Sequence, residues 1–214
     1  MNKTTKTLAV ISVLSGGVLL ISNLAAVKIW SLFGIPFDGG LLLFPLIYVL
    51  GDLAVELFGE KTARTIIWSS FFLNLLAAGV FLLVGRLPAY AGWENQTAYD
   101  TILGFVPRVV VGSLVAYVSS SLINNIIFQR MKDATVFEEQ NKRFFSRAIG
   151  SSAIARLIDT VVFEIVAFFG VLSIKDFLIQ LAFAYLAGMI LEIVLFPITN
   201  LLAYKLRVGK KPQQ

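Results

Sequence analysis

Residues 66–84 read IIWSSFFLNLLAAGVFLLV, a run of 19 residues without a charged side chain. An α-helix rises 1.5 Å per residue, so a helix over this run is about 28 Å long. The hydrocarbon core of a bilayer is about 30 Å thick. The run therefore predicts a membrane-spanning helix.

Five further apolar stretches flank this run and have similar or greater lengths. Together they give six candidate spans: Leu8–Trp30, Leu41–Phe58, Ile66–Val84, Val109–Ile127, Ile149–Leu172 and Phe177–Tyr204. The spans hold more than half of the 214 residues, which leaves no room for a soluble domain of ordinary size. The last span is so long that it requires a tilt or a kink at Pro197. We expect an all-α, polytopic membrane protein with six transmembrane helices, forming one domain over residues 1–214.

The composition agrees with a membrane protein and excludes several kinds of enzyme. The chain is 57% hydrophobic and 14% charged, with a mean hydropathy of +0.83, whereas a soluble domain is about 25% charged. It has no cysteine and no histidine. It therefore lacks thiolate nucleophiles, the usual zinc ligands and the commonest general base. We expect no catalytic residue, no metal and no cofactor, and we predict that the protein is not an enzyme.

The positive charges predict the orientation in the membrane. Thirteen of the 18 Lys and Arg residues fall in segments on the same side as the two termini, and four fall on the opposite side. Because cytoplasmic segments of membrane proteins carry the excess of Lys and Arg, both termini and residues 128–147 are expected in the cytoplasm. The net charge of +5 is then a topology signal, and we expect an inner-membrane protein that contacts lipid and no nucleic acid.

The segment 86–107 is expected on the outer side. It contains Pro88, Tyr90, Trp93 and Tyr99. Aromatic side chains favour the level of the lipid headgroups, so an interfacial segment is one interpretation. A lid over an outer vestibule is the other.

Ionisable residues inside the spans are the candidates for function, because each costs about 2.5 kcal/mol or more at membrane depth. Asp52 and Asp159 lie near the middle of the second and fifth spans, and Glu192 lies in the sixth. Glu56 follows Asp52 by one helical turn, and Arg156 precedes Asp159 by three residues. Each also has a structural interpretation. Arg156 and Asp159 can pair to lock helices together, and Asp52 and Glu56 can contact basic residues at the inner helix end.

The acids outnumber the cations within the spans. Glu164 completes a set of five acids and is expected to approach the outer interface, whereas Lys28 and Arg156 are the two cations. An acid-rich midplane suits protons, cations, or a solute that presents several N–H donors.

An ordered set of short motifs resembles a known family. In the first half these are Ser22-Asn23, Lys28, Phe44-Pro45-Leu46-Ile47-Tyr48, and then Asp52 and Glu56. In the second half they are Gly150-Ser151-Ser152 and Arg156-Leu157-Ile158-Asp159-Thr160. The chain resembles the queuosine precursor transporter family, also called the vitamin uptake transporter family, over nearly its whole length. The resemblance implies import of 7-cyano- and 7-aminomethyl-7-deazaguanine bases across the inner membrane.

Such a base suits the candidate residues. Its ring N–H and exocyclic amino group lie side by side, so that one carboxylate can accept both, and its flat ring can stack on an aromatic side chain. We expect substrate-binding side chains at midplane positions, with Asp52 and Glu192 as the principal ones: Asn23, Tyr48, Asp52, Glu56, Arg156, Asp159, Tyr185 and Glu192.

Further hypotheses concern the architecture and rival functions. Three spans in each half favour an inverted repeat, in which Asp52 and Asp159 face each other. Small-residue stretches would allow a homodimer. The main alternative function is the substrate-binding membrane subunit of an ATP-driven vitamin importer. The absence of a Walker motif means that any ATP hydrolysis needs a partner. An intramembrane aspartyl protease would also use two membrane-depth aspartates, but Val49-Leu50-Gly51-Asp52 lacks its Gly-x-Gly-Asp motif.

Overall fold

The protein is almost entirely helical. The computed structural model describes residues 3–133 and 144–208, with the side chains of 124–152 and several positions from 192 onward, Glu192 among them, outside the description. The helices are α1 (Lys3–Ala25), α2 (Phe44–Phe58), α3 (Glu60–Gly85), α4 (Gln96–Leu103), α5 (Val106–Asp133), α6 (Phe144–Phe168) and α7 (Ile174–Val208). Between α1 and α2 lie the strands β1 (Ile29–Leu32) and β2 (Ile35–Asp38) and a 3-10 helix, η1 (Gly39–Leu43).

Several helices are long and apolar enough to cross a bilayer. Four such segments lie among the described residues: Thr4–Ala25, Glu60–Gly85, Gln96–Ile123 and Ile174–Leu195. Large apolar side chains on them point outward, for example Val13, Phe72 and Ile193. So much exposed apolar surface is suited to lipid contact rather than to water. The chain is therefore an all-α, multi-pass membrane protein.

The number of spans stays a prediction at six. The second expected span is the helix α2, whose 15 residues make it about 22 Å long at 1.5 Å per residue. The fifth is α6, a helix of 25 residues whose first side chains are outside the description. The inverted repeat also stays a prediction.

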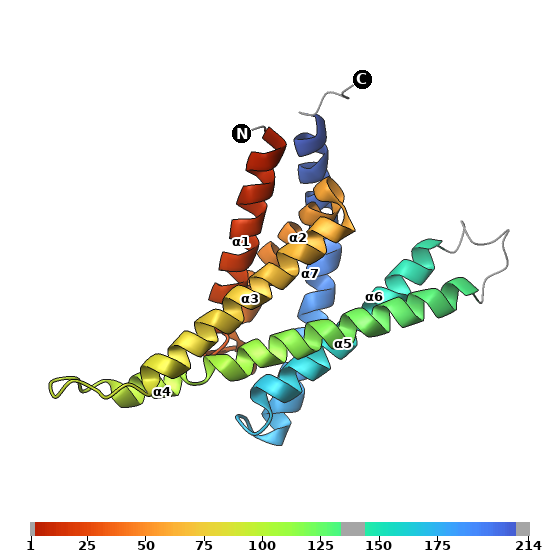
Figure 1. Ribbon diagram of the computed structural model, residues 1–214. Helices are drawn as coiled ribbons and strands as arrows, with labels where there is room; N and C mark the ends of the chain where they lie inside the picture. The colour runs from red at the N-terminus through yellow and green to blue at the C-terminus, as the bar shows by residue number, and fades with distance from the viewer. Residues whose placement is uncertain (1–2, 134–143, 209–214) are drawn as a thin grey trace.

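The two ends of the molecule carry different elements (Figure 1). The start of α1, the end of α7 and the junction of α2 and α3 lie together at one end, here called the terminal end. The β hairpin, α4 and the turn between α6 and α7 lie toward the opposite end, here called the hairpin end. The segment 128–147 belongs partly to α5 and α6, and 134–143 is outside the described residues.

The β hairpin corrects the predicted first span. That prediction carried the helix to Trp30, but α1 ends at Ala25 and Trp30 lies in β1, opposite Phe37 of β2. Phe33 and Gly34 form the two-residue turn, and both have positive φ angles, as in the turns that match the twist of hairpin strands. Hydropathy does not distinguish this strand from a continued helix, because an apolar run of a few residues fits either structure.

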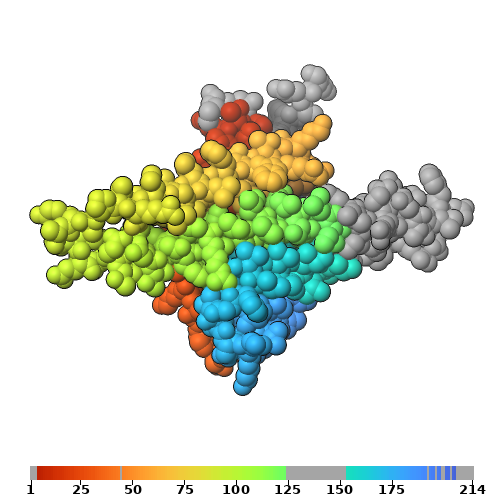
Figure 2. Space-filling model, turned by 60° about the horizontal axis from the view of Figure 1, so that its bottom comes forward, coloured from red at the N-terminus to blue at the C-terminus, as the bar shows by residue number. Residues whose placement is uncertain are grey.

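The hairpin packs onto α7. The ring of Phe37 meets the edge of Phe183 with 6.4 Å between centroids, and Trp30 covers Phe37 at 5.4 Å. The Trp30 indole N–H donates to the backbone carbonyl of Asp38 at 3.0 Å. Figure 2 shows the hairpin end, where the orange surface of this part of the chain lies beside the blue surface of α6 and α7. The hairpin is thus a fixed part of the helical body.

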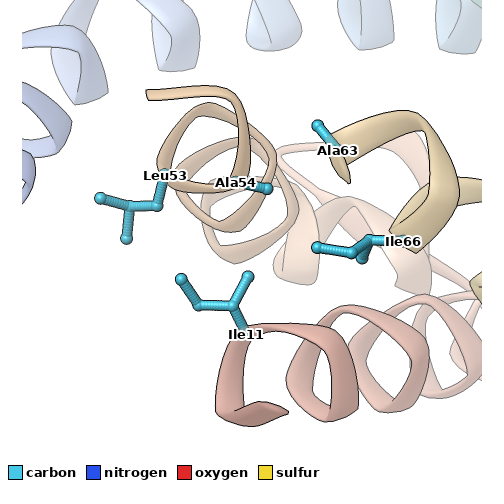
Figure 3. Close-up of a cluster of buried hydrophobic side chains, with 5 residues drawn as sticks. All are labelled: Ile11, Leu53, Ala54, Ala63 and Ile66. Carbon is cyan, nitrogen blue, oxygen red and sulfur yellow. The ribbon is translucent and has the colours of Figure 1, made fainter. Parts of the chain in front are cut away.

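A buried apolar cluster joins α1, α2 and α3 toward the terminal end. Ile11, Leu53, Ala54, Ala63 and Ile66 point toward one another from these three helices (Figure 3). The side chains of Ala54 and Ala63 are small, so the backbones of α2 and α3 can approach each other closely. The chain reverses between α2 and α3 at Gly59, whose φ of 80° is a conformation that glycine adopts without strain.

A second buried cluster joins α5, α6 and α7 toward the hairpin end, and consists of Ala26, Val109, Ala167, Phe168 and Phe177. Beside it, Arg108 of α5 donates to the backbone carbonyls of Val166 and Phe169 at 2.8 and 2.6 Å. Val166 lies in the last turn of α6 and Phe169 directly follows the helix, so the Val166 carbonyl is one of those for which the helix itself offers no N–H partner. Arg108 therefore fixes the end of α6 against α5.

Candidate functional site

A cavity of about 380 Å³ lies between the helices. Small-molecule sites commonly have volumes of about 300–1,000 Å³. Its walls come from α1, α2, α3, α5, α6, α7 and the hairpin and are mostly apolar. Polar and charged side chains also line it: Ser15, Ser22, Asn23, Asp38, Tyr48, Asp52, Ser70, Ser113, Tyr117, Arg156, Asp159, Thr160 and Glu164. No residue of the fully described segment 86–107 is among the lining residues, so the lid interpretation of that segment has no support here.

Arg156 and Tyr48 join α6 to α2 across the cavity wall. The guanidinium carbon of Arg156 lies 4.4 Å from the centroid of the Tyr48 ring, and its Nη1 donates a hydrogen bond to the Tyr48 hydroxyl. Gly188 of α7 is close to both, since a Cβ there would lie 3.5 Å from Arg156 Nη1 and 3.6 Å from the Tyr48 oxygen. A cation–π contact and a charge-assisted hydrogen bond on the same ring hold Arg156 in one orientation.

Asp159 lies one turn further along α6 on the same cavity wall. Its Oδ1 accepts a hydrogen bond from Ser120 Oγ of α5 at 3.2 Å. Asp159 and Arg156 interact electrostatically, as the spacing of three residues predicted. The pair is therefore shared among α2, α5 and α6 rather than confined to one helix.

Asp52 occupies the α2 wall and keeps an exposed side chain. Aromatic rings lie on other walls of the cavity: Phe71 and Tyr117 contact each other with centroids 5.3 Å apart, and Phe163 comes from α6. Carboxylates, a guanidinium and flat apolar rings thus meet in one space. Such a surface can bind a flat, polar heterocycle that offers both N–H donors and a carbonyl acceptor.

Asn23 is buried and tied to α3. Its Nδ2 donates to Asn74 Oδ1 at 2.7 Å, and Asn74 Nδ2 donates to the Ser70 carbonyl at 2.8 Å. Asn74 is fully buried and Asn23 is 3% exposed. Because Asn23 donates one N–H to Asn74, its second N–H and its side-chain carbonyl oxygen can bind other partners. The chain of hydrogen bonds fixes α1 against α3.

Comparison with known proteins identifies the family of the chain. Residues 38–202 match a family model described as "Putative vitamin uptake transporter". The chain belongs to this vitamin uptake transporter family. The matched region contains Tyr48, Asp52, Arg156 and Asp159 and leaves out Asn23.

Curated relatives carry related names. The chain is 33% identical over 153 residues to the "Probable queuosine precursor transporter" of Bacillus subtilis, covering 70% of this chain and 64% of that protein. It is 32% identical over 162 residues to a protein of the same name in Haemophilus influenzae, covering 73% and 64%. It is 27% identical over 138 residues to the "Queuosine precursor transporter" of Escherichia coli, covering 64% and 58%. The match thus spans somewhat under two thirds of each relative's length. No solved structure matches the chain.

The cavity of this family member brings together five of the eight predicted site residues. Asn23, Tyr48, Asp52, Arg156 and Asp159 all line it. Their role in binding stays a prediction.

The other three predicted residues have different positions. Glu56 is exposed on α2, one turn beyond Asp52, and is not a lining residue. Tyr185 is half-buried, and its hydroxyl donates to the Ala153 carbonyl at 3.5 Å instead of facing the cavity wall. Glu192 belongs to α7, and its side chain is outside the described part.

Two lining acids were not among the predicted site residues. Asp38 follows a short apolar segment that carries no functional motif, and nothing in the sequence indicates its burial. Glu164 was expected near the outer interface. It does lie close to the hairpin end of α6, but it is 1% exposed and faces the cavity rather than solvent or headgroups. A search for span acids that lack a cation one turn away would have kept Glu164 together with Asp52, Glu56 and Glu192.

Proposed function

We propose that this chain imports queuosine precursors, the 7-cyano- and 7-aminomethyl-7-deazaguanine bases, through the cavity between its helices. Two observations support the proposal. Two relatives that are 32–33% identical carry the name "Probable queuosine precursor transporter". In this chain, membrane-depth carboxylates and a guanidinium line one cavity that also has aromatic walls. The second observation carries most of the argument, because it concerns this chain's own residues.

The proposed contacts follow from the chemistry of the base. The carboxylate of Asp52 accepts the ring N–H and the amino group together, and Asp159 offers a further acceptor on the α6 wall. The guanidinium of Arg156 donates to the ring carbonyl, and the Tyr48 ring that it stacks on offers a flat surface. Asn23 adds one further polar group. Glu192 stays in the proposed site because of its depth in α7, whereas Glu56 and Tyr185 are left out, since they do not line the cavity.

The proposal includes the cellular setting. The excess of basic residues on one side favours an inner-membrane location with both termini in the cytoplasm. We expect the chain to act without a cofactor and without a catalytic step. A homodimer is compatible with this arrangement and not required by it.

Uptake by the purified chain alone tests the proposal. Proteoliposomes containing only this protein, without nucleotide, should take up labelled 7-cyano-7-deazaguanine with saturation, and unlabelled 7-aminomethyl-7-deazaguanine should compete. Asp52→Asn should reduce uptake strongly. Glu94→Gln, which removes an exposed carboxylate that does not line the cavity, is the matched control and should behave as the wild type.

Two results would contradict the proposal. Binding without uptake would favour the substrate-binding subunit of an ATP-driven importer. Neither binding nor uptake of any deazaguanine would remove the assigned substrate class altogether.

A further inference from the structure

Two buried acids line the hairpin end of the cavity. Asp38 of β2 is 3% exposed and Glu164 of α6 is 1% exposed, and both line the cavity. Their carboxyl groups are close enough to interact electrostatically. The substrate contacts proposed above use neither residue.

Asp38 is held in place by the chain that follows it. Its Oδ1 accepts the backbone N–H of Gly40 at 2.8 Å, and Ser22 Oγ of α1 donates to the Gly40 carbonyl at 3.2 Å. A Cβ on Gly40 would lie 2.8 Å from Asp38 Oδ1 and 2.9 Å from the Ser22 backbone oxygen. Glycine is therefore required for this close contact. Burial raises the pKa of Asp38 to about 6, although the hydrogen bond from Gly40 acts in the opposite direction.

Glu164 is held by an amide with an unused acceptor. Gln180 Nε2 of α7 donates to Glu164 Oε2 at 2.8 Å, and Gln180 is fully buried. Among the described residues, the Oε1 of the same amide has no hydrogen-bond partner. Buried polar atoms are nearly always paired. The N–H side of the amide is directed at Glu164, so oxygen acceptors outnumber donors in this buried region.

The cations on the surrounding elements are directed elsewhere. Lys28, after α1, and Lys175, in the first turn of α7, are exposed, and Arg108 of α5 donates to carbonyls at the end of α6. Arg156, nearer the start of α6, is stacked on Tyr48 and interacts with Asp159. Within the described part of the chain, neither Asp38 nor Glu164 has an ion-pair partner.

Two neighbouring carboxylates without a cation cannot both be ionised at low cost in a medium of low dielectric constant, so such a pair binds positive charge. A proton satisfies the pair with a single O–H donor. A metal ion would need more ligands, and no group of three or more acidic, His or Cys side chains suited to a metal occurs among the described residues.

We propose that Asp38 and Glu164, positioned by Gln180, form the binding site of a proton that is transported together with the base. The inference rests on the proposed function and adds its driving force. The pair takes up one proton from the outer side, shares it as a carboxylic acid beside a carboxylate, and releases it to the cytoplasm. No covalent bond of the substrate changes.

A proton gradient across proteoliposomes tests the inference. With one proton per base, an outside that is one pH unit more acidic should raise the accumulated base about tenfold in the wild type. Asp38→Asn and Glu164→Gln should abolish this gain while still exchanging labelled for unlabelled base at equal pH. Glu94→Gln should keep the wild-type gain. Uptake that ignores the gradient would overturn the inference and leave the proposed function intact, whereas absence of any uptake or exchange would count against the function itself.

A comparison of the two substrates shows whether the acid pair binds a proton or the ammonium group of the substrate. The variants should affect the neutral cyano base and the cationic aminomethyl base alike. A loss restricted to the aminomethyl base would mean that the pair binds the substrate's ammonium group, and would overturn the inference.

If the variants fold poorly, a measurement on the wild-type protein that needs no transport also tests the inference. Infrared difference spectra of the purified wild-type protein, titrated from pH 5 to pH 9, should contain a protonated carboxyl band that shifts when the base binds. A spectrum without such a band anywhere in this range would contradict a proton on the pair.

Discussion

Replacing Arg156 by Ala should destabilise the protein, because this side chain links three helices. The substitution removes a cation–π contact with Tyr48 at 4.4 Å, worth about 0.5–2 kcal/mol. It also removes a charged hydrogen bond to the Tyr48 hydroxyl, worth about 1.5–3 kcal/mol. Because Arg156 is only partly buried and the two terms overlap, we expect a total of about 2–4 kcal/mol.

Thermal unfolding in detergent measures this effect. For a protein of this size, 2–4 kcal/mol corresponds to a decrease in Tm of roughly 4–16 °C. Tyr48→Phe keeps the ring and loses only the hydrogen bond, so it should give a smaller decrease. Adding Asp159→Ala to Arg156→Ala should recover part of the loss, since it removes the carboxylate left without its cation. An Arg156→Ala protein as stable as the wild type, or strictly additive losses in the double variant, would refute the reasoning.

Three further predictions concern topology and packing. A single cysteine at Gln140 should resist an impermeant thiol reagent in intact cells and react after permeabilisation; labelling of intact cells would reverse the orientation. Asn23→Ala should lower the free energy of unfolding by about 1–3 kcal/mol, because it leaves the fully buried Asn74 oxygen without its donor, and unchanged stability would show that this hydrogen bond is dispensable. Gly40→Ala should cost about 1–3 kcal/mol, since its Cβ meets three oxygens within 3 Å, whereas Gly17→Ala, with nothing within 4 Å, should be neutral or stabilising; equal Tm values for both would contradict the tight contact.

Apolar run length predicted most of the helices, because a helix that crosses a bilayer needs about 20 apolar residues. The cores of α1, α3, α5, α6 and α7 all fall within predicted spans. The β hairpin could not be predicted from this signal. Residues 26–30 continue the apolar run of α1, and their hydropathy is the same in a helix and in a strand.

Depth in the membrane predicted several of the charged side chains that line the cavity. Asp52, Arg156 and Asp159 were chosen because charge is costly at the midplane, and all three line the cavity. Glu56 shares a face of α2 with Asp52, but one turn moves a side chain about 5.4 Å along the helix, which is enough to leave the cavity.

No local sequence pattern predicts that Asp38 and Glu164 line the same end of the cavity. It depends on how the hairpin folds back over α1 and α7, and hence on contacts between distant parts of the chain such as Phe37 with Phe183. A single sequence contains no periodic signal for such contacts. Glu164 was recognised as an acid at depth, yet its burial depends on Gln180 of the next helix.

The most direct test of the account is calorimetric titration of the purified protein with 7-cyano-7-deazaguanine, comparing the wild type with Asp52→Asn. The substitution keeps the side-chain volume and replaces an acceptor by a donor that opposes the N–H groups of the base. Leaving those donors unpaired costs about 1–3 kcal/mol, so we predict one bound base per wild-type chain and an affinity at least about fivefold weaker for Asp52→Asn, with normal expression and Tm. Wild-type affinity in Asp52→Asn would contradict the assigned site, and no binding of the base to the wild-type protein would contradict the account as a whole.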